Sequence, residues 1–264
     1  MLNNRRTITN QHVKAFKPST DLKHKAFYRG VSGLDISSST VQFPSSTPHG
    51  NTSGFLTAPK ARGKYPGVIM IHEIWGLVDH IKDVCMRLSR EGYVALGVDL
   101  FNGKTITNIE DGHKIRQQLT EEKILADLNS AHTYLKTLKN VDPKHIGSIG
   151  FCMGGGLALL LACKNPEITA AVVFYGRNPT PLDLVKNLQG PVLGNYAGAD
   201  MAIKEADTNL LKEAMKKYGK TFDIKTYPGA PHGFFNDTRG SYRPEAAKDA
   251  WNRTLKFYSK YLKT

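Results

Sequence analysis

The chain has 264 residues, of which 40% are hydrophobic, so it is long enough to bury one substantial core. Its formal net charge is +13, but Lys and Arg are spread along the whole sequence without a clustered basic run, which argues against nucleic acid as a partner. Three cysteines, an odd number, do not form a disulfide framework and favour a reducing, cytoplasmic environment.

The first part of the chain is polar and lacks periodicity. We therefore expect residues 1–38 to form an N-terminal extension and residues 39–264 to form a single domain. Arg5-Arg6-Thr7 resembles the start of a twin-arginine export signal, but no apolar stretch follows it, so export is not expected unless a longer precursor carries a signal. The sequence also lacks an apolar run of about 18 residues, and a membrane is not expected as a partner.

Beyond residue 38, short apolar strands alternate with amphipathic helices. A turn-rich stretch at residues 44–51 separates the first two strands and predicts an entry hairpin. The alternation predicts an α/β fold in which helices cover both faces of a mostly parallel, doubly wound sheet. The expected strands are residues 40–43, 54–57, 66–71, 93–98, 146–150, 170–174, 191–196 and 222–227, and the expected helices are residues 79–90, 110–118, 121–139, 153–163, 203–218 and 244–261.

The segment Gly150-Phe151-Cys152-Met153-Gly154 lies where a predicted strand ends and a helix begins. It matches the G-x-nucleophile-x-G elbow, with cysteine in the place of the more usual serine. The flanking glycines leave room for a tight turn, and the positive end of the following helix favours a thiolate. Two other interpretations stay open. Cys152 could be a buried structural cysteine, or the glycines could form a phosphate-binding loop, although the expected acidic residue about 20 positions later is missing.

A thiol nucleophile needs a base and an acid that orients the base, and in α/β hydrolases the order along the chain is nucleophile, acid, histidine. His232 is the only histidine after Cys152, and it lies in a loop rich in proline and glycine. Asp200 follows the strand at 191–196 and is the candidate acid. Asp183 and Asp207 are its rivals, although both are more simply interpreted as surface carboxylates.

The loop after the strand at 66–71 reads His72-Glu73-Ile74-Trp75-Gly76. We expect the backbone N–H groups of Ile74 and Met153 to form an oxyanion hole. His72 and Glu73, with His80 further on, do not have the HExxH spacing of zinc proteases, so neither a metal nor a cofactor is expected. Four aromatic side chains near predicted strand ends could line an apolar pocket or belong to the core: Trp75, Phe101, Tyr175 and Phe234.

Five segments in this order make the chain resemble the dienelactone hydrolase family over roughly residues 40–262: HEIWG (72–76), GYVALGVDLF (92–101), GFCMGG (150–155), YAGAD (196–200) and PHGF (231–234). The resemblance implies an α/β-hydrolase fold with a Cys152–His232–Asp200 triad and with Glu73 beside Cys152. In this family an anionic substrate is understood to displace the glutamate, which then takes the thiol proton. The implied activity is hydrolysis of small lactones or activated esters, as in carboxymethylenebutenolidases, through an acyl-thioester intermediate.

Well-known members of that family bind the substrate carboxylate with two arginines, and the corresponding positions here fall near Asn102–Gly103 and on Asn236. Arg239 and Arg243 are close in sequence, and Arg239 is the candidate contact for an anion. The missing arginines favour a second hypothesis, a broad-specificity carboxylesterase or thioesterase on the same fold. A third is a non-catalytic redox-sensing or binding protein that uses Cys152. The expected partner is a small ester or lactone, and the expected assembly is a monomer or small homo-oligomer.

Overall fold

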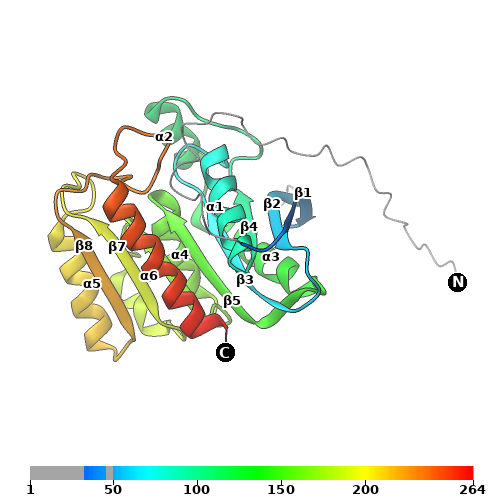
Figure 1. Ribbon diagram of the computed structural model, residues 1–264. Helices are drawn as coiled ribbons and strands as arrows, with labels where there is room; N and C mark the ends of the chain where they lie inside the picture. Colours follow the sequence, from blue (N-terminus) through cyan, green and yellow to red (C-terminus); the bar gives the residue numbers. More distant parts are fainter. Residues whose placement is uncertain (1–32, 46–49, 264) are drawn as a thin grey trace, which may run out of the picture.

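The computed structural model describes residues 33–45 and 50–263, and its centre is an eight-stranded sheet (Figure 1). The strands are β1 (Ile36–Pro44), β2 (Asn51–Pro59), β3 (Tyr65–Ile71), β4 (Val94–Asp99), β5 (Val141–Phe151), β6 (Ala170–Phe174), β7 (Val192–Ala197) and β8 (Phe222–Tyr227). Their order across the sheet is β1-β2-β4-β3-β5-β6-β7-β8. The hairpin strand β2 pairs antiparallel with β1 and β4, and every later pair is parallel, which confirms the predicted fold class.

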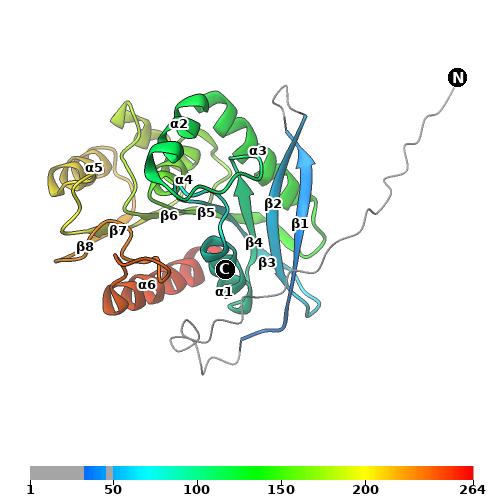
Figure 2. The same ribbon diagram turned by 90° about the horizontal axis from the view of Figure 1, so that it is seen from above.

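Helices cover both faces of the sheet (Figure 2). One face carries α1 (Asp79–Arg90) and α6 (Pro244–Leu262), and the other carries α3 (Glu121–Thr137), α4 (Met153–Lys164) and α5 (Glu205–Lys217). The short α2 (Ile109–Gln118) lies on the α3 side, and a 3₁₀ helix, η2 (Leu182–Asn187), precedes β7. The described residues therefore have two apolar cores, one on each face, as expected for a doubly wound sheet.

The central strands were predictable because they are buried on both faces. In β4 all six residues are buried, and such strands read as continuous apolar runs. The hairpin is also confirmed, but β1 starts at Ile36, earlier than expected. Ser37 to Ser39 carry no apolar periodicity, and their strand conformation comes from backbone pairing with Leu56 to Ala58. Residues 1–32 of the predicted extension lie outside the described residues, so the division at residue 38 stays a prediction.

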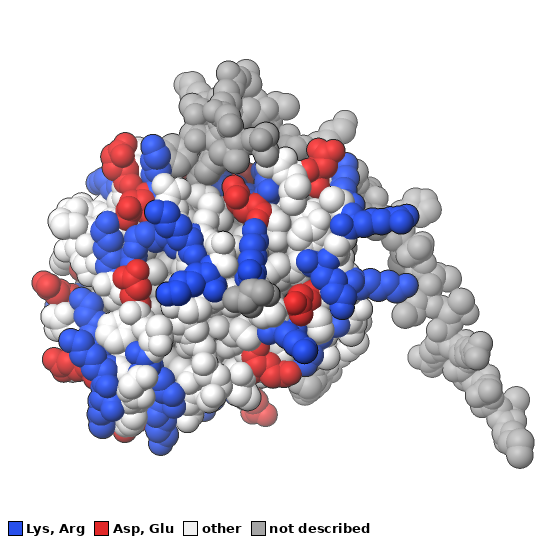
Figure 3. Space-filling view, turned by 60° about the horizontal axis from the view of Figure 1, so that its bottom comes forward, with Lys and Arg blue, Asp and Glu red and all other residues white. Residues whose placement is uncertain are grey.

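The surface shows how the positive charge is distributed. On the face drawn in Figure 3, Lys and Arg side chains are interspersed with Asp and Glu rather than gathered into one patch. Several of these side chains form ion pairs, such as Lys136 with Glu167 at 2.6 Å and Lys225 with Asp249 at 2.7 Å. In the described part of the chain, no helix combines the length and the apolar character needed to cross a membrane.

Candidate active site

The candidate catalytic residues come from the carboxyl ends of neighbouring strands. Cys152 follows β5, Asp200 lies in the turn after β7, and His232 lies in the loop after β8. The loop that begins at His72 follows β3, the neighbour of β5 in the sheet. Because parallel strands end at the same edge of a sheet, these segments meet there although they lie far apart in the sequence.

The backbone at Cys152 is a sharp corner. Its φ is 55° and its ψ is −117°, and a non-glycine residue adopts such a conformation only when its surroundings hold it there. The Cys152 N–H donates to the carbonyl of Phe174 at 3.0 Å, which ties the corner to the next strand. A Cβ on Gly150 would overlap the carbonyl of Gly154, so only glycine allows the turn at that position. The half-buried thiol therefore stands at the N-terminus of α4.

His232 and Asp200 form a short, buried pair. Nδ1 of His232 lies 2.7 Å from Oδ2 of Asp200, whose side chain is completely buried. Oδ1 of Asp200 accepts the backbone N–H groups of Ala202 at 2.8 Å and Ile203 at 3.0 Å. Burial alone would raise the pKa of Asp200, but the hydrogen bonds from His232 and from these N–H groups lower it below its usual value. The carboxylate is thereby kept ionised and fixed in direction.

The two rival acids have other partners. Asp207 accepts the N–H of Lys204 at 2.8 Å and caps α5, and Asp183 lies 3.8 Å from Lys217 on the surface. The structure thus brings Asp200, rather than either rival, to His232.

The imidazole of His232 connects the acid to the thiol. With Nδ1 directed at Asp200, its second nitrogen is left for a hydrogen bond with Cys152. Burial would lower the pKa of His232, but the hydrogen bonds with Asp200 and Cys152 and the charges of both residues raise it to about 10. Both neighbours therefore favour the protonated imidazole, and a protonated imidazole stabilises a thiolate beside it once the thiol proton has left.

His72 has a structural role in the loop after β3. Its Nδ1 lies 2.6 Å from the carbonyl of Glu73, and its Nε2 accepts the N–H of Leu100 at 3.2 Å. The ring is completely buried, and burial lowers the pKa of His72, so the imidazole is neutral with its proton on Nδ1. Among residues 33–45 and 50–263 there is no group of three or more His, Cys, Asp or Glu that could hold a metal ion.

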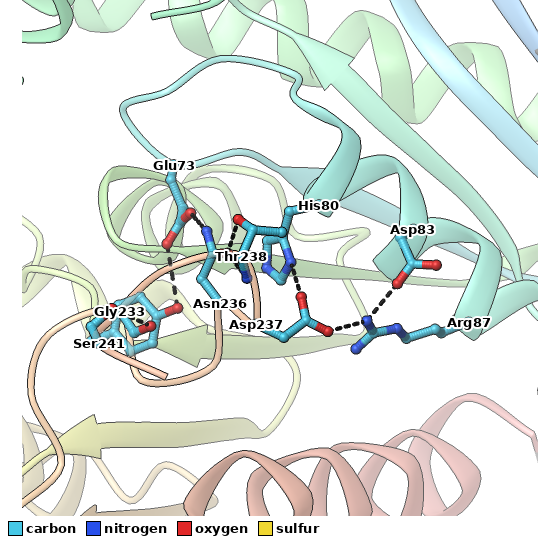
Figure 4. A network of polar contacts seen from close by, with 10 residues as sticks. Glu73, His80, Asp83, Arg87, Gly233, Asn236, Asp237, Thr238 and Ser241 are labelled. Atoms are coloured by element: carbon cyan, nitrogen blue, oxygen red, sulfur yellow. Dashed lines mark hydrogen bonds and ion pairs between the residues drawn. The ribbon is translucent and has the colours of Figure 1, made fainter. Parts of the chain in front are cut away.

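The Glu73 carboxylate is buried and held on both oxygens (Figure 4). Asn236 donates its Nδ2 to Oε2 at 2.7 Å, and the hydroxyl of Tyr175 donates to Oε1 at 3.4 Å. Tyr175, which has a φ of 39°, is completely buried, and its pKa is raised well above the usual value by burial and then by the charges of Glu73 and Cys152. The Tyr175 phenol is thus close to both Glu73 and Cys152.

Asn236 was not predicted as a partner of Glu73. The sequence marked it only as a position without an arginine, four residues after His232. Its orientation is fixed, because its Oδ1 accepts both the N–H and the hydroxyl of Thr238, at 3.0 and 2.7 Å. The NH₂ group must therefore face Glu73. A contact between residues 163 positions apart leaves no local pattern in the sequence. The one signal that could have pointed to Asn236 was its position four residues after His232.

The expected oxyanion-hole residues belong to two different segments. Ile74 follows Glu73 in the loop after β3, and Met153 is the first residue of α4, so its N–H has no partner within the helix. An N–H from each of these two segments is the arrangement that stabilises a developing oxyanion. Their role stays a prediction.

The aromatic candidates fall into two groups. Trp75 is half-buried, and the guanidinium of Arg239 lies 3.7 Å from the centre of its ring. Phe101 packs edge-on against His72 with ring centres 4.8 Å apart, and Phe234 is buried among aromatic rings. Trp75 and Arg239 are thus exposed enough to contact a substrate, whereas Phe101 and Phe234 pack behind the site. Substrate contact by any of these four residues, or by the buried Tyr175, stays a prediction.

A mostly parallel, doubly wound sheet with a cysteine at a strand–helix elbow, a histidine and an acid at its carboxyl edge fits the α/β-hydrolase class. The chain belongs to the dienelactone hydrolase family, which it matches over residues 52–262. It is therefore a hydrolase that acts on carboxylic ester or lactone bonds.

Individual relatives agree with this assignment. A Synechocystis sp. protein provisionally named a carboxymethylenebutenolidase is 36% identical over 87% of this chain and 99% of its own length. A protein with the same provisional name from Saccharolobus solfataricus is 40% identical over 74% of this chain and 90% of its own length. A crystal structure of a provisionally assigned dienelactone hydrolase from Klebsiella pneumoniae is 31% identical, with a TM-score of 0.80 over 86% of this chain and 100% of that protein.

Proposed function

We propose that the protein hydrolyses small lactones or activated esters with Cys152 as the nucleophile. The proposal is carried by one observation. The thiol at the strained corner interacts with an imidazole, whose pKa it helps to raise, and Nδ1 of that imidazole is 2.7 Å from a buried carboxylate. This is the arrangement of nucleophile, base and orienting acid that covalent acyl transfer requires.

In the first half of the reaction, the Cys152 thiolate attacks the carbonyl carbon of the substrate. The carbonyl oxygen becomes an oxyanion, and the N–H groups of Ile74 and Met153 stabilise it. When the tetrahedral intermediate collapses, the carbon–oxygen bond of the ester or lactone breaks. The alkoxide takes a proton from the imidazolium of His232, and an acyl-thioester remains on Cys152.

In the second half, neutral His232 takes a proton from a water molecule, and the resulting hydroxide attacks the thioester carbonyl. The same N–H groups stabilise the second oxyanion. The carbon–sulfur bond then breaks, which releases the carboxylic acid and restores the pair of Cys152 and His232. Asp200 stays ionised throughout and keeps Nδ1 of His232 protonated.

Glu73 is proposed as the residue that links thiol ionisation to substrate binding. In the free protein its carboxylate is bound by Asn236 and Tyr175 rather than by Cys152. A substrate that releases Glu73 from these donors would free a buried carboxylate to accept the thiol proton. A thiol that ionises fully only with substrate bound is less exposed to oxidation at rest.

A nitrophenyl acetate assay tests this function. We expect the wild-type protein to release nitrophenol and Cys152→Ala to lose the activity, and we expect an acetyl adduct on Cys152 in rapidly quenched samples analysed by mass spectrometry. Activity retained in Cys152→Ala would refute the cysteine mechanism. If neither protein is active and Cys152 is oxidised reversibly, the redox-sensing hypothesis is favoured instead. A screen of lactones and short-chain esters would then define the substrate.

Arg239 offers one way to distinguish a substrate with a carboxylate from a broader range of esters. Its exposed guanidinium lies over Trp75 at the site, where it can bind an anion. We expect Arg239→Ala to raise KM for a carboxylate-bearing ester by roughly tenfold and to leave KM for a neutral ester unchanged, because a charge-assisted hydrogen bond contributes about 1.5–3 kcal/mol. Equal effects on both esters would favour the broad carboxylesterase or thioesterase.

We also propose a cytoplasmic location. The three cysteines are free thiols, with Cys85 and Cys163 buried and Cys152 partly exposed. A catalytic thiol that must stay reduced suits a reducing compartment.

A further inference from the structure

We propose that Asp237 is a positioning residue for the reaction: by bridging α1 to the loop that carries His232, it holds Asn236 against Glu73 and His232 against Cys152. This inference rests on the proposed function and deepens it. Here the clamp means Asp237 together with His80 and Arg87, and the His232 loop means residues 232–243.

The clamp is well formed and largely buried (Figure 4). Oδ1 of Asp237 lies 3.1 Å from Nδ1 of His80, and Oδ2 accepts Nη2 of Arg87 at 2.7 Å. The exposed fractions of the side chains are 16% for Asp237, 1% for His80 and 10% for Arg87. Burial would raise the pKa of Asp237, but the contacts with His80 and Arg87 lower it far below its usual value. The clamp therefore contains a buried carboxylate that stays charged.

The clamp also contacts the elbow. The ring of His80 packs edge-on against both Phe151 and Phe235, with ring centres 6.3 and 6.2 Å away. Phe151 immediately precedes Cys152, and Phe235 immediately precedes Asn236. These two phenyl rings stack on each other at 5.2 Å. His80 is thus packed against both segments whose relative position sets the geometry of the site.

Three side chains fasten the His232 loop to the segment from Glu73 to Arg87. Asn236 binds Glu73, Asp237 binds α1, and Arg239 stacks on Trp75. Asp237 is the central one of the three and the one with a buried ion pair. Removing one partner of such a pair is costly, since it leaves a charge buried without compensation. We infer that loss of the Asp237 charge loosens the loop, so that Asn236 and His232 move away from their partners.

The test is Asp237→Asn, with Asp83→Asn as the matched control. Asp83 also pairs with Arg87, but it lies on α1 itself and is 41% exposed, so it does not connect the helix to the loop. For Asp237→Asn we expect kcat on nitrophenyl acetate to fall at least tenfold, while KM changes less than threefold. We also expect the pH midpoint of Cys152 alkylation by iodoacetamide to rise toward that of an ordinary thiol, about 8.5. For Asp83→Asn we expect wild-type values in both measurements.

Two results would overturn the inference. One is an unchanged kcat and alkylation profile in folded Asp237→Asn, and the other is an equal loss in Asp83→Asn. If Asp237→Asn does not fold, Arg87→Lys replaces it, because lysine keeps the charge but not the planar guanidinium. That variant should lower kcat by a smaller factor, and wild-type kcat in it would overturn the inference. Absence of nitrophenyl acetate hydrolysis in the wild type itself would instead refute the proposed function, so the two failures are distinguishable.

Discussion

Asp200→Asn is the substitution that tests the triad most directly. In the structure Oδ1 of Asp200 accepts two backbone N–H groups, and Oδ2 faces Nδ1 of His232. An asparagine in this place keeps its oxygen toward the two N–H donors and must therefore turn its NH₂ group toward His232. Nδ1 would then have to accept a hydrogen bond, and the proton of the neutral imidazole would move to the nitrogen that faces Cys152. A neutral imidazole protonated on that side cannot take a proton from the water molecule that hydrolyses the thioester.

The size of the loss follows from the contact. A hydrogen bond to a charged group contributes about 1.5–3 kcal/mol, and about 1.4 kcal/mol corresponds to a tenfold change. Loss of the bond alone should lower kcat/KM on the order of 10- to 150-fold, and the wrong tautomer should lower it further. The pKa of His232 should also fall from about 10, because Asp200 supports its charged form.

Nitrophenyl acetate hydrolysis and the pH profile of Cys152 alkylation measure both effects. Asp207→Asn is the matched control, because Asp207 caps α5 and has no contact with His232. We expect Asp207→Asn to keep wild-type kcat/KM and to lose only about 1 kcal/mol of stability. A kcat/KM for Asp200→Asn within threefold of the wild type, or an equal loss in both variants, would refute the assignment of Asp200.

Three further results are expected. Cys152→Ser should lose on the order of 100-fold or more in kcat, measured with nitrophenyl acetate, because a hydroxyl is far harder to deprotonate than a thiol; full turnover would contradict a site tuned to sulfur. Gly154→Ala should destabilise the protein by about 2–3 kcal/mol in urea unfolding, since its Cβ would overlap the carbonyl of Ile71, whereas Gly240→Ala, which meets open space, should change little. Folding raises the pKa of His232 to about 10, so its charge stabilises the protein fully below pH ~6.5 and no longer above about pH 10. The difference in unfolding free energy between the wild type and His232→Gln should therefore shrink across that interval, and a constant difference would argue against the raised pKa.

The sequence predicted those parts of the fold whose burial leaves a clear apolar pattern in the local sequence. Central parallel strands such as β4 are buried on both faces and appear as apolar runs, and amphipathic helices such as α6 show their buried face in their periodicity. The start of β1 was missed because Ser37 to Ser39 are held in the strand by pairing with β2 rather than by burial. The 3₁₀ helix Leu182–Asn187 spans six residues, too few for a helical period to be read.

The same distinction applies to the candidate site: some of its residues carry a local sequence signal, and others do not. Cys152, Asp200 and His232 could be singled out because each lies at a strand end within a local motif, and their order along the chain restricts the choice. The contacts of Asn236 with Glu73 and of Asp237 with His80 have no such order. They join positions 163 and 157 residues apart through side chains of ordinary polar types. They are brought together by the packing of the His232 loop against α1 and against the loop after β3.

The neutral side chain at Asn236 bears on the choice of substrate. Its amide acts both as acceptor and as donor: Oδ1 accepts hydrogen bonds from Thr238, and Nδ2 donates one to Glu73. A guanidinium at this position could donate to Glu73 but could not accept from Thr238, since arginine has no acceptor. The loop in this chain is therefore built around an amide and carries no positive charge at that point. A substrate carboxylate would have to find its cation elsewhere, and we propose Arg239, whose guanidinium lies over Trp75, for that contact.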